Sequence, residues 1–432
     1  MTKTKDSQSL SRLLQIFQSP WTISLLALVI RLAFLWIPPS RTHAFSLDYP
    51  PYPNLGLEAW NIAHSLAAHQ GFASPFLWMS GPTGPTAWLT PVFPCLLSVI
   101  VRIFGPHTYA SLLAILILNE FFSAATCLPL FYLARKVGGD RLSSLTAGLW
   151  AILPLAILIP YKAVWYISLS ALLFAVLMLA TLTILASNQP ARWLGYGLLW
   201  GAQLMTNPSF ATTIPFVFLW LIWELRKQRR RWLQLPAYAA IALILTCTPW
   251  TIRNFVVFHT FVPLRSNFGL ELWRWNNPAG GLHPSSSSVE LTKYIQLGEI
   301  PYMKQKRIEA IQFIRTHPGE FVHTTKKRIL YFWIIGRKEG AFLAFTNLGF
   351  VMLIPLGLLF MVRKNFSHFA LLAMVPAIFP LLYYLTLASV FYRHAIEPVL
   401  TVIAGVGLEG IISFCLRFLP RRPHARVRVA CG

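Results

Sequence analysis

Apolar runs recur along almost the whole chain, separated by shorter polar stretches. Most are about as long as the roughly 20 residues that a helix needs to cross a hydrocarbon core of ~30 Å. They are apolar on all sides, whereas a helix of a soluble protein carries a single apolar stripe. The pattern predicts an all-α polytopic membrane protein with apolar segments at 21–38, 86–104, 109–134, 142–160, 163–186, 193–206, 209–224, 233–250, 341–362, 367–388 and 394–417.

The basic residues between these runs predict the topology. Clusters of Lys and Arg stand at the start of the chain, in 225–232 and in 417–428. Because basic loops stay in the cytoplasm, both termini are expected there, which requires an even number of crossings, about ten. The short segments on either side of Asn207-Pro208 could form one broken helix or two.

Two long polar stretches then lie outside the cytoplasm, at 39–85 and 251–340. They divide the chain into an N-terminal transmembrane module, 1–250, an extracytoplasmic segment, 251–340, and C-terminal transmembrane helices with a basic cytoplasmic tail, 341–432. The first polar stretch belongs to the N-terminal module. In the second we expect short helices, two of them divided at 316–319, and a turn at "HPSSSS".

Composition agrees with a membrane protein. Of 432 residues, 56% are hydrophobic and 12% are charged, whereas soluble domains carry about 25% charged residues. A net charge of +23 would suggest nucleic-acid binding in a soluble protein. Here the basic residues lie between apolar runs, so we expect no nucleic-acid partner. None of the five cysteines lies in the two polar stretches, and no disulfide framework is predicted.

Acidic residues are scarce, which makes those in the first polar stretch informative. Asp48 is followed by Glu58, which begins the pattern "LEAWNIAHSLAAHQGF". Apolar residues recur there at helical spacing, while Glu58, Asn61 and Ser65 share the opposite face. We expect an amphipathic helix in the outer interface. Glu58 is either an acid that favours the helix dipole or a functional carboxylate.

Two ionisable residues, Arg31 and Glu120, fall inside apolar segments. Ionisable groups at that depth pair with one another or serve function, and we expect an ion pair between them. The many aromatic residues near segment ends are typical of an interfacial belt. Stacking of a sugar on Trp60, Trp273 or Trp275 is the alternative.

Five motifs occur in a distinctive order. They are "EAWNIAHSLAAHQGF", "GPTAWLTPVFP", "NPS" within a later apolar region, "PWTIRN" before the second polar stretch, and "FYRHAIEP" before the last segment. This order resembles the GT-C membrane glycosyltransferases that use polyprenyl-phosphate sugars, in particular the protein O-mannosyltransferase and aminoarabinose-transferase superfamily with its family 39-type relatives. The resemblance covers roughly residues 20–275 and the last apolar segment.

The resemblance implies a glycosyltransferase that moves a monosaccharide from a polyprenyl-phosphate donor to a lipid, glycan or protein acceptor. A carboxylate of the first outer loop would act as catalytic base, a role that falls on Glu58 or Asp48. We expect a bacterial inner-membrane protein whose active site faces the periplasm or the cell exterior. Because a lipid phosphate is already a good leaving group, no cofactor is expected and a metal is optional.

Cations must meet the negative charge that develops on the leaving phosphate. Candidates at the outer ends of apolar segments are Lys162, Arg253, Arg393 and His394, with Asn61 as a residue that orients the acceptor or the carboxylate. Snorkelling at the interface is the alternative for each cation. A transporter or flippase of lipid-linked sugar is the rival function, but such proteins place charges at the midplane and often contain repeats.

Overall fold

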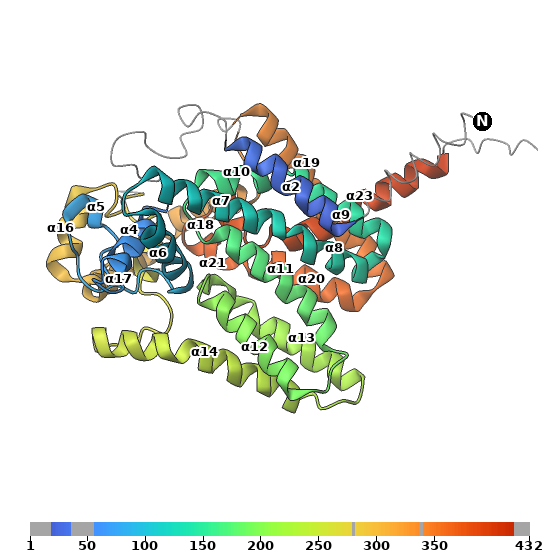
Figure 1. Cartoon of the computed structure of the whole chain (residues 1–432), viewed down its shortest axis with the longest axis horizontal. Coiled ribbons are helices and arrows are strands. Elements are labelled where there is room, and N and C mark those ends of the chain that lie inside the picture. Colours follow the sequence, from blue (N-terminus) through green and yellow to red (C-terminus); the bar gives the residue numbers. More distant parts are fainter. Residues whose placement is uncertain (1–18, 36–55, 279–280, 337–339, 419–432) are drawn as a thin grey trace, which may run out of the picture.

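The computed structural model describes residues 19–35, 56–278, 281–336 and 340–418. Within these ranges every element is a helix, and no strand is formed. The helices form a bundle with a group of short extramembrane helices, among them α4 (Leu57–Ala67), α5 (Leu77–Ser80) and α16 (Ser288–Leu297), at one end (Figure 1).

Each apolar segment of the sequence coincides with a helix or a pair of helices. Those of the first half are α2 (Pro20–Phe34), α6 (Val92–Phe104), α7 (Tyr109–Ala125), α8 (Cys127–Gly138), α9 (Asp140–Ile152), α10 (Pro154–Lys162), α11 (Ile167–Ile184), α12 (Pro190–Leu204), α13 (Ile214–Lys227) and α14 (Gln234–Phe258). Those of the second half are α19 (Ala341–Lys364), α20 (Phe366–Ile378), α21 (Pro380–Leu385) and α23 (Glu397–Phe418).

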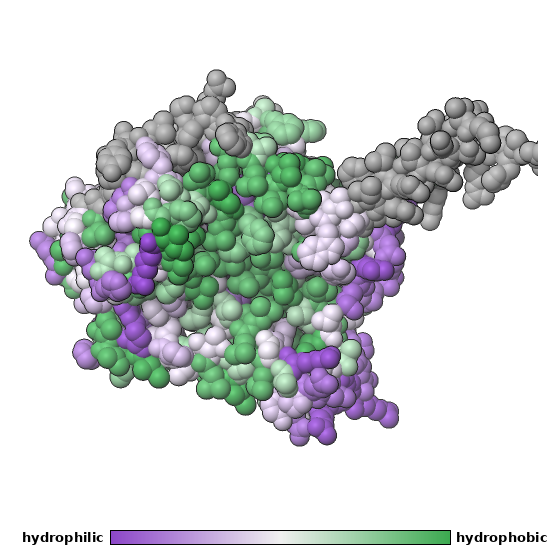
Figure 2. All heavy atoms as spheres, viewed as in Figure 1, coloured by the Kyte–Doolittle hydropathy of each residue, from purple (hydrophilic) through white to green (hydrophobic). Residues whose placement is uncertain are grey.

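Among the described residues, six stretches are long and apolar enough to cross a membrane: Tyr109–Gly138, α11, α14, α19, Phe366–Leu385 and α23. The pair α9 and α10, bent by 44°, would be a seventh, and α2 and α6 are shorter apolar helices. Hydrophobic side chains cover the middle of one face, and hydrophilic side chains gather toward its ends (Figure 2). The chain is therefore an integral membrane protein of the all-α class.

The segments around Asn207-Pro208 form two helices rather than one. A 3-10 helix, η1 (Pro208–Thr212), separates α12 from α13. Pro208 cannot continue the hydrogen bonds of α12 because it lacks an N–H. The Asn207 side chain instead accepts the backbone N–H of Ser209 and caps the new turn. The break places Ser209 where it can contribute to a site.

Glycines allow two helix pairs to approach closely. A Cβ on Gly197 would collide with the Ala239 carbonyl, and one on Gly357 would collide with that of Ile403. These contacts join α12 to α14 and α19 to α23, which pack against each other over much of their lengths. Small residues at such crossings are typical of membrane helices, which associate through close backbone packing.

The second polar stretch folds as its sequence predicts. α15 (Phe268–Trp273) and α16 are followed by α17 (Glu299–Thr316) and α18 (Pro318–Trp333), which are divided at His317-Pro318. The "HPSSSS" run contains a turn and ends at the start of α16. A short helix, α22 (Val390–Arg393), precedes α23.

Two expectations from the sequence need correction. The polar face of α4 is not open as expected: Asn61 and Ser65 are fully buried, because α4 packs against α6 and Asn61 donates to the Pro75 carbonyl at 2.8 Å. Arg31 also forms no ion pair with Glu120. Its guanidinium donates to the Ser123 hydroxyl and to the carbonyls of neighbouring helices, so it joins α2 to α7 and α9.

Candidate active site

The two polar stretches meet around a cavity of about 760 Å³. Its wall combines residues from the start of α4, from the segment 264–286 and from the α10–α11, η1 and α21–α22 regions. Ionisable groups on this wall come from segments about 200 positions apart in the sequence: Glu58, Arg265, Glu271, Arg274 and His283. A site with both carboxylates and guanidinium groups therefore exists only in the folded chain.

Glu58 stands in the first turn of α4, and its side chain is 21% exposed. Gly56 fixes this position: its φ is +88°, and a Cβ there would collide with the Val164 carbonyl. Burial raises the pKa of Glu58, and neighbouring Glu271 raises it further, while Arg274 and Arg265 lower it. A carboxyl with a raised pKa is a stronger base than an ordinary, solvated glutamate.

His283 approaches Glu58 from the second polar stretch. Its Nε2 lies 3.8 Å from Glu58 Oε1. Burial, together with Arg274, lowers the pKa of His283 to about 3, so the imidazole is neutral near pH 7. The pair is therefore a carboxylate facing a neutral ring and not a salt bridge.

The cations of the cavity are Arg265 and Arg274. Arg265 donates from Nε to the Trp88 carbonyl at 2.8 Å and from Nη1 to the Tyr166 hydroxyl at 3.2 Å. Arg274 Nη1 lies 3.6 Å from Glu271, and its buried Nε has no hydrogen-bond partner among the described residues. These guanidinium groups retain donors for an anion, and Arg suits bidentate contact with phosphate.

Aromatic side chains form another part of the wall. The rings of Tyr383 and Tyr392 stack with centroids 4.9 Å apart, and Trp165 meets Tyr392 edge-on at 5.1 Å. The Tyr383 hydroxyl donates to Ser209 Oγ at 2.9 Å, so the break after α12 positions this wall. Aromatic faces beside a few polar groups are typical of small-molecule sites.

Among the sequence-predicted site residues that the structure describes, only Glu58 lines this cavity. Asp48 lies outside the described residues. Asn61 is buried against Pro75, as described above, and Lys162 lines a second, smaller cavity. Trp60, Trp273 and Trp275 do not line the main cavity.

The three remaining candidates are engaged in other contacts. Arg253 donates to the carbonyls of Thr86 and Phe72 at 2.7 and 2.9 Å. Arg393 is fully buried and pairs with Glu397 at 2.9 Å, while His394 Nδ1 lies 2.6 Å from the same carboxylate. Arg253 and Arg393 therefore do not flank one common cavity, because their guanidinium groups join segments of the protein.

Sequence reasoning missed Arg265, Glu271, Arg274 and His283. The charged positions 265, 271 and 274 follow soon after the apolar segment 233–250. This closeness to the end of a predicted segment was the signal that could have identified them as site residues. Another carboxylate of the second polar stretch is buried as well: Glu290 pairs with Lys306 at 2.7 Å and is 2% exposed.

Glu299 connects the second polar stretch to residues 86 and 87, which directly follow the first. Its buried carboxylate accepts the Ala87 N–H and the Ser266 hydroxyl, each at 2.7 Å, and the Tyr294 hydroxyl at 2.8 Å. The Thr86 hydroxyl donates to the same group. This contact holds Trp88 and Arg265 next to each other, since both residues neighbour its partners.

We predict that Glu299→Gln destabilises the protein by roughly 3 kcal/mol, because an amide NH₂ would face buried donors. The midpoint of thermal unfolding in detergent should fall accordingly. Glu320→Gln, at an exposed acid in the first turn of α18, is the matched control and should unfold like the wild type. Equal stability of both variants would show that Glu299 does not connect these segments.

Among the described residues, no group of three or more His, Cys, Asp or Glu side chains is arranged to hold a metal ion. The second cavity, of about 300 Å³, is lined mainly by apolar residues of α10 and of the segments 331–336 and 388–391. It shares Ser389 and Phe391 with the main cavity, so the two adjoin.

The fold is similar to that of archaeal oligosaccharyltransferase AglB from Archaeoglobus fulgidus. Comparison of this chain with the AglB complex that contains an inhibitory peptide and a dolichol-phosphate gives a TM-score of 0.55 at 13% identity, covering 93% of this chain and 52% of that one. The apo form of the A. fulgidus oligosaccharyltransferase gives 0.55 at 16% identity, covering 91% and 51%. The chain thus spans about half the length of the oligosaccharyltransferase it matches.

ArnT from Cupriavidus metallidurans bound to undecaprenyl phosphate gives a TM-score of 0.36 at 13% identity, covering 90% of this chain and 78% of that one. A score this low does not establish a shared fold. No protein-family model matches the sequence, and no curated protein matches it significantly. The similarity to the oligosaccharyltransferase nevertheless extends over nearly the whole chain, which therefore shares the fold of the matched part of that protein.

Proposed function

We propose that the chain is a membrane glycosyltransferase that moves a monosaccharide from a polyprenyl-phosphate donor to an acceptor hydroxyl on the outer face of the membrane. The observation that supports this most is the meeting of Glu58 with Arg265 and Arg274 in one aromatic-walled cavity. Glycosyl transfer from a lipid phosphate needs a base for the incoming hydroxyl and cations for the leaving phosphate.

In the proposed reaction, Glu58 removes the proton of the acceptor hydroxyl as its oxygen attacks the anomeric carbon. The bond between that carbon and the phosphate oxygen breaks, and the electron pair leaves with the phosphate. The transition state resembles an oxocarbenium ion, as in glycoside hydrolysis. Arg265 and Arg274 stabilise the negative charge that develops on the phosphate. The proton remains on Glu58 until solvent removes it.

The two adjoining cavities suit the two parts of such a donor. The sugar and phosphate would occupy the main cavity, where the charged groups lie and where the aromatic wall offers ring faces for the sugar. The first isoprene units fit the apolar second cavity, which opens beside Ser389 and Phe391. In this arrangement Lys162, on the wall of the second cavity, lies on the lipid side of the phosphate.

A transporter or flippase of lipid-linked sugar remains the rival function. It would need a path across the membrane, whereas the charged groups of the cavity belong largely to the extramembrane segments 56–58 and 264–286. The test is transfer of label from a panel of radiolabelled polyprenyl-phosphate sugars by membranes that contain the protein. One sugar should give a labelled product that is absent without the protein. Failure of every donor in the panel would contradict the proposal.

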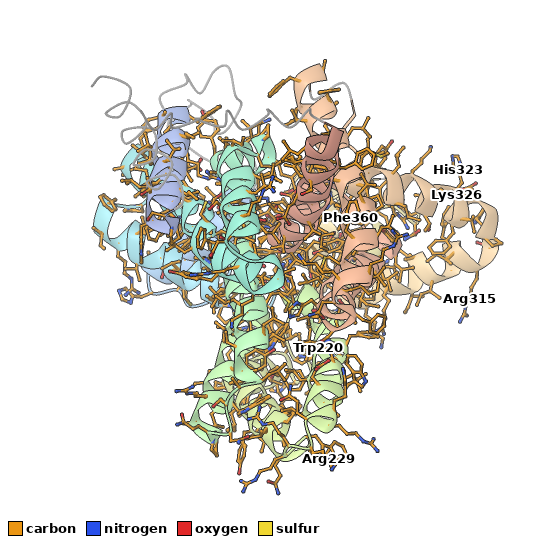
Figure 3. All side chains as sticks on the ribbon, turned by 90° about the vertical axis from the view of Figure 1, so that its right-hand side faces the viewer. Trp220, Arg229, Arg315, His323, Lys326 and Phe360 are labelled. Atoms are coloured by element: carbon orange, nitrogen blue, oxygen red, sulfur yellow. The ribbon has the colours of Figure 1, made fainter. Side chains whose placement is uncertain are left out.

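The proposed outer location of the site is tested by cysteine labelling. Lys326 on α18 and Arg229 in the basic loop are both exposed and point away from the bundle (Figure 3). In a background without native cysteines, Lys326→Cys should react with a membrane-impermeant maleimide in intact cells. Arg229→Cys should react only after permeabilisation. The reverse pattern would place the cavity in the cytoplasm and contradict the proposed orientation.

A further inference from the structure

His283 and Glu58 meet at the cavity although they belong to different polar stretches. His283 precedes α16 and is 6% exposed, while Glu58 begins α4. Nε2 of the ring faces Oε1 of the carboxylate across 3.8 Å. That distance exceeds the 2.7–3.2 Å typical of a hydrogen bond, and an approach of about 1 Å would form one. Catalytic hydrogen bonds are often long before substrate binds.

The hydrogen bonds of His283 determine which nitrogen carries its proton. Nδ1 accepts the backbone N–H of Ser285 at 3.1 Å and lies 2.6 Å from the Ser285 hydroxyl, which can donate to it. A nitrogen that accepts a backbone N–H carries no hydrogen of its own. In the neutral ring the proton is therefore on Nε2 and points toward Glu58.

The ring orientation is also fixed by packing. Trp88 meets the imidazole nearly perpendicularly at 5.3 Å, and Phe76 does so at 5.8 Å. Phe76 belongs to the first polar stretch, like Glu58, and Trp88 follows shortly after its end. The ring can therefore neither rotate freely nor turn its Nε2–H away from the carboxylate without disturbing these contacts.

We propose that His283 is the positioning residue for the base: its neutral Nε2–H holds Glu58 Oε1, so that Oε2 faces the acceptor hydroxyl. This inference rests on the proposed function. It adds that the base becomes competent only when the second polar stretch is docked on the first. His283 does not exchange a proton with substrate and acts solely through Glu58.

A neutral donor suits this task better than a cation. A lysine or arginine in direct contact would strongly favour the carboxylate form and weaken the base. The charged groups that face Glu58 are Glu271 from α15, Arg274 directly after this helix and Arg265 before it. Of the two arginines, Arg274 is ion-paired with Glu271 and Arg265 donates to Trp88 and Tyr166. The hydrogen bond that orients Glu58 is therefore assigned to the uncharged ring of His283.

Three variants test the proposal in the transfer assay. His283→Leu removes the donor, His283→Gln replaces it with an amide N–H, and His323→Leu changes an exposed histidine of α18 that points away from the bundle (Figure 3). We expect His283→Leu to lower kcat by roughly 10- to 100-fold with little change in donor KM, since a misplaced group costs up to about 100-fold. His283→Gln should recover most of this loss, and His323→Leu should match the wild type.

The pH profile separates positioning from packing. A hydrogen bond to the carboxylate favours its charged form. Losing it in His283→Leu should therefore move the acidic limb of kcat/KM to higher pH, and His283→Gln should move it back. If His283→Leu and His283→Gln lose the same amount of activity and the acidic limb of kcat/KM does not move, His283 has a packing role only. Full activity of His283→Leu would overturn the proposal outright.

A donor-free measurement keeps this test apart from that of the proposed function. In nitrogen-15 NMR of histidine-labelled protein, the signal that disappears in His283→Gln belongs to His283. At neutral pH it should show a neutral ring protonated on Nε2, and its Nε2–H resonance should shift in Glu58→Gln. A ring protonated on Nδ1, or no shift, would overturn the positioning role even if transfer is active. If NMR gives the expected result but the protein transfers no sugar, the contact between His283 and Glu58 is supported and the glycosyltransferase function is rejected.

Discussion

Replacing Glu58 by Gln is expected to lower the rate of sugar transfer by about 10²–10⁴-fold, the usual contribution of a general base. The amide keeps the shape of the side chain but cannot take the acceptor proton. Donor binding and thermal stability should be unchanged, because Glu58 lies on the cavity wall and is only partly enclosed. Initial rates with saturating donor, together with a donor-binding measurement, provide the test.

The matched control for this variant is Glu320→Gln, which changes an exposed carboxylate of the same predicted outer side. Asp48→Asn distinguishes the second candidate for the base. If Glu58→Gln stays fully active while Asp48→Asn is inactive, the base is Asp48. If both variants stay active, neither carboxylate is the base, and the transporter function is favoured.

The pH dependence of the wild type follows from the same assignment. The base must be deprotonated, so activity should fall as the pH falls through the pKa of Glu58. Because burial raises this pKa above the ordinary value of 4.5, the acidic limb should lie at a higher pH than a solvated glutamate would give. The limb should disappear from the residual activity of Glu58→Gln.

Replacing Arg265 by Gln is expected to lower kcat by roughly 10²–10³-fold, as for the loss of one donor to developing negative charge. Donor KM should rise as well, because the guanidinium also meets the phosphate of the bound donor. Arg265→Lys should recover only part of the activity, since an ammonium keeps the charge but not the two-pronged geometry. Steady-state kinetics with varied donor concentration would measure both effects.

Arg265 also donates to the Trp88 carbonyl and the Tyr166 hydroxyl, so the variants need a stability measurement beside the kinetics. Arg315→Gln is the control, because Arg315 is an exposed arginine of α17 that points away from the bundle (Figure 3). A folded Arg265→Gln protein with normal kcat and KM would exclude Arg265 from phosphate binding.

The helices could be predicted from the sequence because apolar periodicity is a local property. The breaks at Asn207-Pro208 and His317-Pro318 were readable for the same reason, since proline interrupts a helix wherever it stands. Four of the five ordered motifs also contribute to the cavity, through Glu58, Trp88, Ser209 and Phe391. A family resemblance can predict positions of this kind, because they lie within the motifs that carry the resemblance.

The cations could not be assigned in the same way. Arg253 and Arg393 stand at the ends of apolar segments of the sequence, where a phosphate-binding group would be expected, but packing directs them to backbone carbonyls and to Glu397. Arg265 and His283 lie in irregular segments without periodicity, and their neighbours are set by tertiary contacts such as Glu299 with Ala87. Which charged residue faces a cavity is decided by these long-range contacts and not by local pattern.

The central claim is that the protein breaks the bond between sugar and lipid phosphate. The most direct test uses purified protein in proteoliposomes with the donor that the panel identifies, and it measures free polyprenyl phosphate together with glycosylated acceptor. The account predicts that wild type releases one polyprenyl phosphate for each sugar transferred and that Glu58→Gln releases almost none. Movement of the intact lipid-linked sugar across the bilayer, with no polyprenyl phosphate released, would contradict it.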